Sequence, residues 1–303
     1  YQEISQLLMY GDLEEDSILY QMGEIFAKYE TGEYNKTGLV RDINVQVKRI
    51  LKVATDYGFD DNLWHNYLTF FLMMSENPFS MTCEKVGASE GSVNALVQND
   101  FRIFKALFDY DFASIEKDLG ISCFSQISDY KAIHKKDLMY NKNVSEKVRA
   151  LSKKLEAAKD EKEFFDGVTG FYKDFGVGMF GLNKAFRIDE KPEGGIAFRA
   201  INNMDTVMLD DLVGYEIQKK KLVDNTEAFV QGKKANNVLL FGDSGTGKST
   251  SIKAIVNQYY KDGLRMIEIY KHQFKYLSTI IADIKNRNYK VIIYMDDISF
   301  EEF

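Results

Sequence analysis

The residues with the clearest chemical potential lie in the segment GDSGTGKST, from Gly242 to Thr250. Gly242, Gly247, Lys248 and Ser249 satisfy the pattern G-x-x-x-x-G-K-[ST], in which backbone N–H groups turn inward around a phosphate. The glycines permit the backbone conformations that such a turn requires. The pattern predicts a nucleoside triphosphate site, with Lys248 as the positive charge on the phosphates and the Ser249 hydroxyl as a ligand of Mg²⁺.

This pattern is specific. With average residue usage, a chance match is expected in roughly one chain of this length in a hundred. The alternative interpretation is a Gly-rich turn that merely joins a strand to a helix.

Two aspartates follow the apolar run VIIYM near the end of the sequence. Asp296 ends this run, where its carboxylate could meet the Mg²⁺ that Ser249 binds. Asp297 is the candidate to orient or deprotonate an attacking water, with Glu301 and Glu302 as nearby alternatives. Both aspartates could instead be polar residues in the turn after a strand.

A strand–turn–helix unit must position these groups. NVLLFG (237–242) predicts a strand before the loop, and STSIKAIVNQYYKDG (249–263) predicts a helix after it that ends at a glycine. LRMIEIY (264–270) and YKVIIYMDD (289–297) predict two more strands, separated by a helix over FKYLSTIIADIKNRN (274–288). Apolar strands that alternate with helices predict a parallel sheet buried on both faces.

The first part of the chain has a helical pattern up to about residue 186. Amphipathic or buried helices are predicted over 16–30, 42–58, 61–77, 92–108 and 145–175. Their aromatic stripes, such as Phe101, Phe104 and Phe108, are predicted to be core residues. This region contains no repeat and no metal-ligand spacing.

A change of pattern predicts two domains. Pro192, followed by Gly194 and Gly195, predicts a turn or linker. The sequence therefore predicts a two-domain α+β chain. A helical N-terminal domain occupies residues 1–190, and an α/β P-loop domain with the first three strands of its sheet occupies 191–303.

Composition narrows the class of protein. The chain has 303 residues, of which 45% are hydrophobic and 28% charged, and this is a globular composition. Cys83 and Cys123 are too few for a disulfide framework, so we expect a cytoplasmic protein. The longest apolar run, residues 67–74, is too short to span a bilayer. The net charge of −7 argues against a broad nucleic-acid-binding face, so we expect neither a membrane nor a nucleic acid as partner.

Together the two motifs resemble those of the AAA+ ATPases. The stretch LDDLVGYEIQKKKLVDNTEAFVQGKKANNVLLFGDSGTGKSTSIKAIV is similar to DUF815, a bacterial family of predicted ATPases, and the similarity extends from about residue 178 through DDISFEE. The resemblance implies ATP and Mg²⁺ as cofactors, adenine contacts from Val213, Gly214 and Tyr215, and metal contacts from Ser249 and Asp296. It also implies that the triphosphate is held by Gly242, Asp243, Ser244, Gly245, Thr246, Gly247, Lys248, Ser249 and Thr250.

The resemblance also carries an expectation about the rest of the protein. An AAA+ sheet has the strand order 5-1-4-3-2, so two strands, the sensor residues, the arginine finger and the helical lid would lie beyond Phe303. We therefore expect the natural protein to continue past residue 303 and to be a homo-oligomer at full length. The first residue is Tyr rather than Met, which suggests that the sequence is also incomplete at its start.

Three functions are compatible with these residues. The first is ATP hydrolysis coupled to the remodelling of an unknown protein partner, which the helical domain recognises. The second is a nucleotide-gated switch or scaffold with little turnover. It is favoured because Asp297 stands where most AAA+ enzymes have Glu. The third is a P-loop phosphotransferase, which shares the phosphate loop but matches the upstream segment less well.

Overall fold

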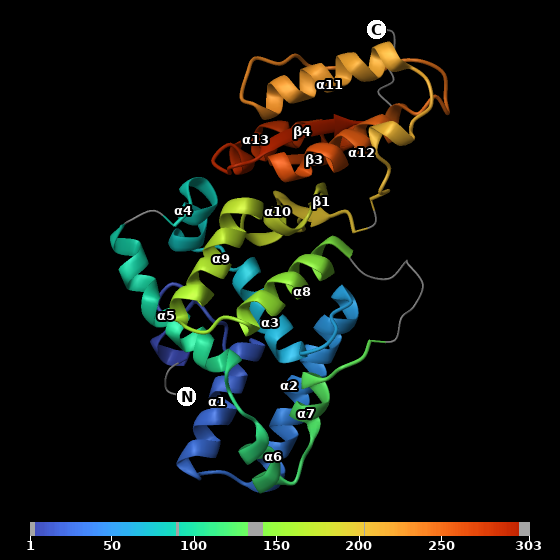
Figure 1. The fold of residues 1–303 in the computed structure, drawn as a ribbon. Helices are drawn as coiled ribbons and strands as arrows, with labels where there is room; N and C mark the ends of the chain where they lie inside the picture. Colours follow the sequence, from blue (N-terminus) through green and yellow to red (C-terminus); the bar gives the residue numbers. More distant parts are fainter. Residues whose placement is uncertain (1–3, 89–90, 133–141, 203, 297–303) are drawn as a thin grey trace. The chain divides into compact units, whose positions relative to one another are not determined.

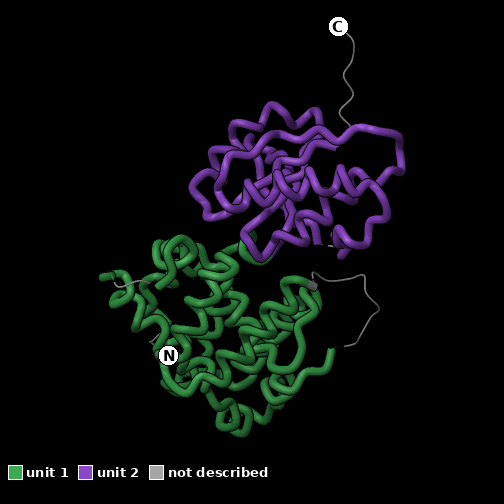
Figure 2. The backbone as a smooth tube through the Cα atoms, turned by 45° about the horizontal axis from the view of Figure 1, so that its top comes forward, with its two compact units in different colours: residues 1–182 green, residues 183–303 purple. Residues whose placement is uncertain are grey.

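The computed structural model describes residues 4–88, 91–132, 142–202 and 204–296. The chain forms two compact units, residues 1–182 and residues 183–303 (Figure 2). This division precedes the boundary that the sequence suggests after residue 190. The physical reason lies in residues 185–200, which join the sheet of unit 2 rather than the helices of unit 1.

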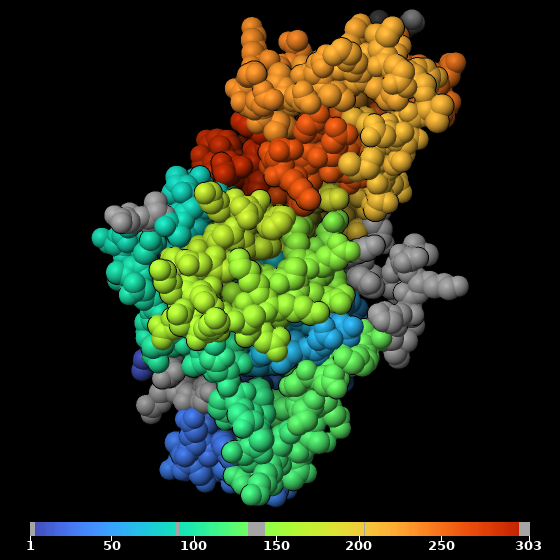
Figure 3. All heavy atoms as spheres, viewed as in Figure 1, coloured from blue at the N-terminus to red at the C-terminus, as the bar shows by residue number. Residues whose placement is uncertain are grey.

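Unit 1 is helical in its described part (Figure 1). Its elements are η1 (Ile4–Gln6), α1 (Ile18–Thr31), α2 (Lys36–Tyr57), α3 (Leu63–Met74), α4 (Pro78–Val86), α5 (Ser92–Phe108), α6 (Ala113–Leu119), α7 (Cys123–Ser128), α8 (Lys142–Glu156), α9 (Glu161–Phe175) and α10 (Gly178–Leu182). The five predicted helical regions are confirmed, and the last of them is two helices, α8 and α9. These two helices lie side by side on one face of unit 1 (Figure 3).

Local signals in the sequence explain where these helices begin and end. The Ser17 side chain accepts a hydrogen bond from the Tyr20 N–H at 3.3 Å and caps α1. Gly58 ends α2 in the left-handed conformation, with φ 68°. Pro78 begins α4 at a position where its missing N–H costs nothing.

The core of unit 1 combines aromatic packing with buried hydrogen bonds. Phe101, Phe104 and Phe108 are all buried, as their spacing predicts. The fully buried Asp100 carboxylate accepts hydrogen bonds from the backbone N–H groups of residues 8, 9 and 10, and the shortest of these is 2.8 Å long. Such bonds hold the N-terminal segment against α5, because a buried carboxylate requires donors.

Unit 2 contains a four-stranded sheet. Its strands are β1 (Ala185–Glu190), β2 (Ile196–Ala200), β3 (Leu264–Ile269) and β4 (Lys290–Met295), in the order β2-β1-β3-β4. β1, β3 and β4 are mutually parallel, whereas β2 pairs with β1 in an antiparallel hairpin. The predicted strands over 264–270 and 289–297 are confirmed, and the sheet is mixed rather than wholly parallel.

Two parts of the strand prediction are wrong. Residues 237–242, predicted as the strand before the phosphate loop, form no strand in the structure. An apolar run becomes a strand only where a neighbouring strand pairs with its backbone, and here Leu239 and Phe241 are 64% and 87% exposed. The second difference is the β1–β2 hairpin, whose turn contains the Pro192–Gly195 segment that composition marked as a turn or linker.

Two helices of unit 2 share a buried core with the sheet. Unit 2 contains η2 (Leu209–Asp211), α11 (Glu216–Val230), α12 (Lys248–Tyr259), η3 (Tyr260–Asp262), η4 (Lys271–Tyr276) and α13 (Leu277–Ile284). Ile255 of α12 and Leu222 of α11 share a buried cluster with Met266 of β3. Helix α12 therefore covers the face of the sheet on which Met266 lies, and α11 packs into the same core.

A buried arginine fastens the start of β3. Arg265 is 1% exposed, and its guanidinium carbon lies 4.1 Å from the centre of the Tyr260 ring and 4.5 Å from that of Tyr289. Its Nη1 donates to the carbonyl oxygens of Tyr260 and Leu264 at 3.1 and 2.9 Å. A planar guanidinium can stack and donate at the same time, which a lysine ammonium cannot do.

Replacing this guanidinium should therefore destabilise unit 2. We expect Arg265→Lys to lower the free energy of unfolding by about 2 kcal/mol. A buried ammonium cannot stack on the Tyr260 and Tyr289 rings, and it cannot reproduce the planar hydrogen bonds of the guanidinium. Urea denaturation followed by circular dichroism measures this change. Arg287→Lys is the matched control, because that half-buried side chain stands 5.5 Å from the Tyr289 ring. Equal losses in the two variants would contradict the role assigned to Arg265.

Candidate functional site

The Gly-rich loop precedes α12 and has the backbone conformation that its glycines allow. Gly242, Gly245 and Gly247 have φ values of 142°, 79° and 82°. The last of these caps α12, and the first backbone hydrogen bond of the helix runs from the Ser251 N–H to the Gly247 carbonyl at 2.8 Å. Residues other than glycine rarely adopt these φ values, so the positions of the glycines determine the shape of the loop.

Lys248 turns back into this loop. Its Nζ donates to the carbonyl oxygens of Gly242 and Asp243 at 2.9 and 2.7 Å. The Thr246 hydroxyl donates to the same Asp243 carbonyl at 2.9 Å and closes the turn. The ammonium group and the positive end of the α12 dipole are thus held at the same end of the helix, an arrangement that attracts an anion.

Ser249 and Asp296 come together from distant parts of the sequence. The Ser249 hydroxyl lies 3.3 and 3.4 Å from the two carboxylate oxygens of Asp296. The serine lies in the first turn of α12, and the aspartate directly follows β4. Hydroxyl and carboxylate oxygens are hard ligands of the kind that Mg²⁺ prefers, so this pair fits the predicted metal contact.

The pair does not amount to a complete protein cage for a metal. In the described ranges, no three His, Cys, Asp or Glu side chains gather into a metal-binding group. Mg²⁺ commonly takes one or two protein ligands and completes its shell with water and phosphate oxygens. The donor set therefore suits a metal that arrives with a nucleotide.

Tyr294 is a neighbour of this pair that motif analysis missed. Tyr294 lies in β4, two residues before Asp296. Burial is the largest cause that raises the pKa of Tyr294 to about 12, and the neighbouring Asp296 carboxylate acts in the same direction. The signal that could have revealed it is strand periodicity, because residues two apart on a strand face the same way.

The predicted adenine contacts lie on an exposed part of unit 2. The side chains of Val213 and Tyr215 are 95% and 57% exposed. Gly214 and Tyr215 both have positive φ, 84° and 56°, at the start of α11. Across the part of the chain that the structure describes, no hydrogen bond joins these residues to the loop at 242–250.

The remaining predicted residues differ in what the structure shows of them. Asp243 and Ser244 are exposed, and Thr250 is half-buried at the start of α12. The carbonyl of Asp243 binds Lys248, as described above, while its carboxylate lies on the exposed surface. Asp297 lies outside the described residues.

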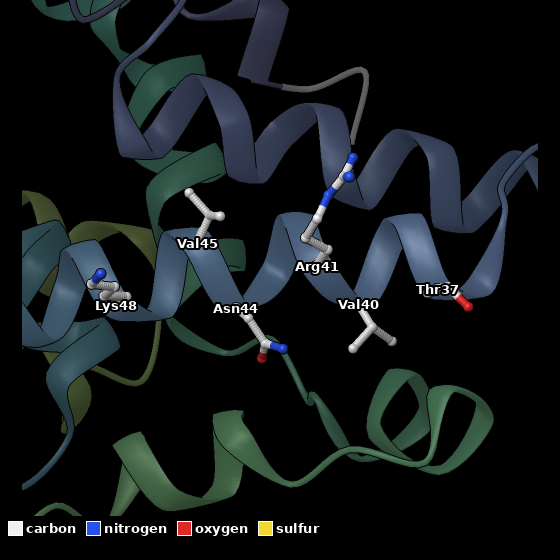
Figure 4. A pocket seen from close by; sticks show the side chains of 6 residues that line it. All are labelled: Thr37, Val40, Arg41, Asn44, Val45 and Lys48. Atoms are coloured by element: carbon white, nitrogen blue, oxygen red, sulfur yellow. The ribbon is translucent and has the colours of Figure 1, made fainter.

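A surface depression occurs in unit 1. It is open, with a volume of about 440 Å³, and lies along one face of α2 (Figure 4). Two of its side chains are basic and none is acidic; it is lined by Thr37, Val40, Arg41, Asn44, Val45 and Lys48. It offers neither a nucleophile with a base nor a carboxylate for a metal.

One further structural finding concerns membranes. Among the helices in the described residues, none is both long and apolar enough to cross a bilayer.

Comparison with known proteins finds a family model that matches the second unit. Residues 182–303 match the family DUF815, described as a protein of unknown function, so the resemblance inferred from the motifs is confirmed for this part of the chain. The large subunit of replication factor C from Methanococcus vannielii is 34% identical over 74 residues. That match covers 24% of this chain and only 15% of the relative. No solved structure matches the chain.

The loop geometry leads to a test of its glycines. A Cβ added at Gly247 would meet no atom within 4 Å, so the cost of Gly247→Ala comes from the backbone conformation alone. We expect it to destabilise the loop–helix junction by about 1–2 kcal/mol, measured by hydrogen exchange in α12.

Gly170→Ala is the control for this substitution. Gly170 lies within α9, and a Cβ there is equally free of contacts, so this change should stabilise its helix by roughly 0.5–1 kcal/mol. If Gly247→Ala left exchange in α12 unchanged, the left-handed conformation would not be essential to the loop.

Proposed function

We propose that unit 2 binds ATP together with Mg²⁺, and that the chain is part of an AAA+ ATPase. The observation that carries the proposal is the arrangement at the start of α12. A loop with three positive-φ glycines holds Lys248, and the next residue, Ser249, meets the Asp296 carboxylate. The match of residues 182–303 to DUF815 supports the same interpretation.

Each residue of the loop has a defined part in this proposal. The backbone N–H groups of the Gly242–Thr250 segment surround the phosphates, and the N-terminal dipole of α12 adds to their attraction. Lys248 exchanges its bonds with the Gly242 and Asp243 carbonyls for bonds with the β- and γ-phosphates. This exchange conserves hydrogen bonds and brings opposite charges together, so it favours the bound nucleotide.

Ser249 and Asp296 are the proposed contacts of the metal. When bound, Mg²⁺ would neutralise charge on the phosphate oxygens. Ser249 supplies a hydroxyl oxygen, and Asp296 binds directly or through water. Val213, Gly214 and Tyr215 are proposed to contact the base, and their exposure leaves them accessible to it.

Hydrolysis and coupling to a partner complete the proposal. Asp297 is proposed to orient the attacking water, because it directly follows the metal-binding carboxylate. Unit 1 is proposed to recognise a protein partner in the cytoplasm, and the full-length protein to act as a homo-oligomer. Support for a reducing compartment comes from Cys83 and Cys123, both of which are free thiols.

A second function deserves its own test because of one residue. An aspartate at position 297 is one methylene shorter than the glutamate that most AAA+ enzymes carry. A shorter base would slow the activation of water and favour a nucleotide-gated switch with little turnover.

Nucleotide binding is the first test. We expect Lys248→Ala to weaken ATP binding about 10- to 100-fold, because it removes charge-assisted hydrogen bonds to the phosphates. Isothermal titration of the chain with Mg-ATP measures the change. Lys253→Ala is the matched control, since this lysine lies on the same helix and pairs with Asp205 at the surface. Unchanged affinity in Lys248→Ala would refute the proposed site.

Turnover separates the two functions. If the protein is an ATPase, the full-length protein should release phosphate steadily, and Asp297→Asn should slow this release by about 10²–10⁴-fold while leaving ATP affinity nearly unchanged. Phosphate release under saturating ATP is the measurement. Tight binding without release in any assembly state would instead support the switch.

A further inference from the structure

A cluster of basic side chains lies at the amino ends of strands β3 and β4. Residues 232–234, 260–265 and 284–290 contain seven Lys or Arg residues and one acidic residue, Asp262. We call the seven the basic edge, and its members are Lys233, Lys234, Lys261, Arg265, Lys285, Arg287 and Lys290. The chain as a whole has a net charge of −7, so this concentration of positive charge is a local feature.

Backbone contacts bring the three segments of the basic edge together. The Lys290 N–H donates to the Gly263 carbonyl at 3.0 Å, where β4 begins beside β3. A Cβ built on Gly232 would lie 3.9 Å from the Lys290 Nζ, so the segment after α11 lies beside the start of β4. Lysines that are far apart in the sequence therefore meet at one edge of the sheet.

Aromatic rings order the cations at the centre of this edge. Arg265 packs against Tyr260 and Tyr289, as described above, and the Arg287 guanidinium carbon lies 5.5 Å from the centre of the Tyr289 ring. The Lys184 Nζ, just before β1, lies 5.5 Å from the centre of the Tyr260 ring. The negative faces of the rings attract these cations and limit their freedom, which reduces the entropy that is lost when an anion binds.

The outer lysines of the basic edge carry charges that no acidic side chain offsets. Lys233, Lys234, Lys261 and Lys285 are exposed, and within the described ranges no ion pair includes them. Like charges that gather without counterions repel one another and destabilise the folded state. An anion that binds here would remove this repulsion.

The basic edge is separate from the candidate nucleotide site. Lys290 begins β4, whereas Asp296 directly follows the end of the same strand. Six residues of extended strand span about 20 Å. A ligand at the basic edge therefore does not have to displace a nucleotide from the Gly-rich loop.

We propose that the basic edge binds a short acidic segment of a protein partner. Carboxylates along a peptide can pair one by one with lysines that come from separate segments. Nucleic acid fits this edge less well. The Tyr289 ring already packs against two guanidiniums and Tyr260 is buried, so neither ring is available to stack on a base. A long polyanion would also extend over a chain whose net charge is negative.

Binding of an acidic peptide to the 303-residue chain tests this inference. The probe is a fluorescein-labelled oligoglutamate of about eight residues, and fluorescence anisotropy measures its affinity. Lys233→Glu/Lys234→Glu should weaken binding roughly tenfold or more, because it reverses two charges of the edge. Raising the salt concentration from about 50 to about 500 mM should weaken binding to the unsubstituted chain by a similar factor, because exposed charges are screened.

The matched control is Lys191→Glu/Lys221→Glu. Both lysines are exposed in unit 2 outside the basic edge, and their reversal changes the net charge by the same amount. We expect this variant to lose less than about twofold in affinity, because screening limits the reach of distant charges. Circular dichroism shows whether each variant keeps its fold.

A second variant excludes a local effect at residues 233 and 234. Lys261→Glu/Lys285→Glu reverses charges on the other two segments of the edge. It should weaken peptide binding by a similar factor if the three segments form one surface.

Three results would overturn the inference. The first is that the unsubstituted chain does not bind the peptide even at low salt. The second is an equal loss of affinity in the control variant, because the attraction would then depend on net charge and not on the edge. The third is tighter binding of an oligothymidylate of the same charge that both edge variants abolish, because the edge would then be a nucleic-acid surface. No nucleotide triphosphate is present in this test, so its outcome is independent of the proposed ATP site.

Discussion

The packing of α12 against β3 and β4 is the constraint on which the candidate site depends. Buried aliphatic side chains such as Ile255 and Met266 seat the helix on one face of the sheet. As a result, its first turn meets the end of β4, and the Ser249 hydroxyl comes within 3.3 Å of Asp296. A slip of one residue in the pairing of β4 would turn Asp296 and Tyr294 to the opposite face, so the site depends on the register of the strands as well as on the presence of its residues.

The β1–β2 hairpin extends this constraint to a part of the chain that carries no motif. By pairing in parallel with β3, β1 gives that strand a neighbour on each side and supplies Arg187 as the partner of Glu268. An acidic side chain that is only 14% exposed requires such a partner. The hairpin therefore belongs to unit 2, because its backbone pairs with β3 and its Arg187 pairs with Glu268. For this reason unit 2 begins before Pro192.

In unit 1, several buried polar side chains bond to the backbone and serve the fold. Two of its buried polar side chains bond to the backbone and hold segments of the fold together: Asp100 accepts from backbone N–H groups, and the His65 Nε2 lies 2.7 Å from the Phe108 carbonyl. Tyr172 donates to the Leu72 carbonyl at 2.6 Å. Groups with such partners stabilise the helices and are not available for chemistry. The helices themselves were predictable, because the 3.6-residue period and the capping residues are local signals.

The sequence alone determined the conformation of the Gly-rich loop. Glycine adopts the positive φ that the loop has at three places, and Lys248 and Ser249 follow the last of these glycines in the first turn of α12. The sequence could not determine which apolar run would pair. Residues 237–242 have the composition of a strand but pair with no strand in the structure, whereas residues 185–190 pair with β3. The physical reason is that φ preferences and helix caps act within a few residues, while strand pairing and side-chain clusters are decided by segments that meet only when the chain folds.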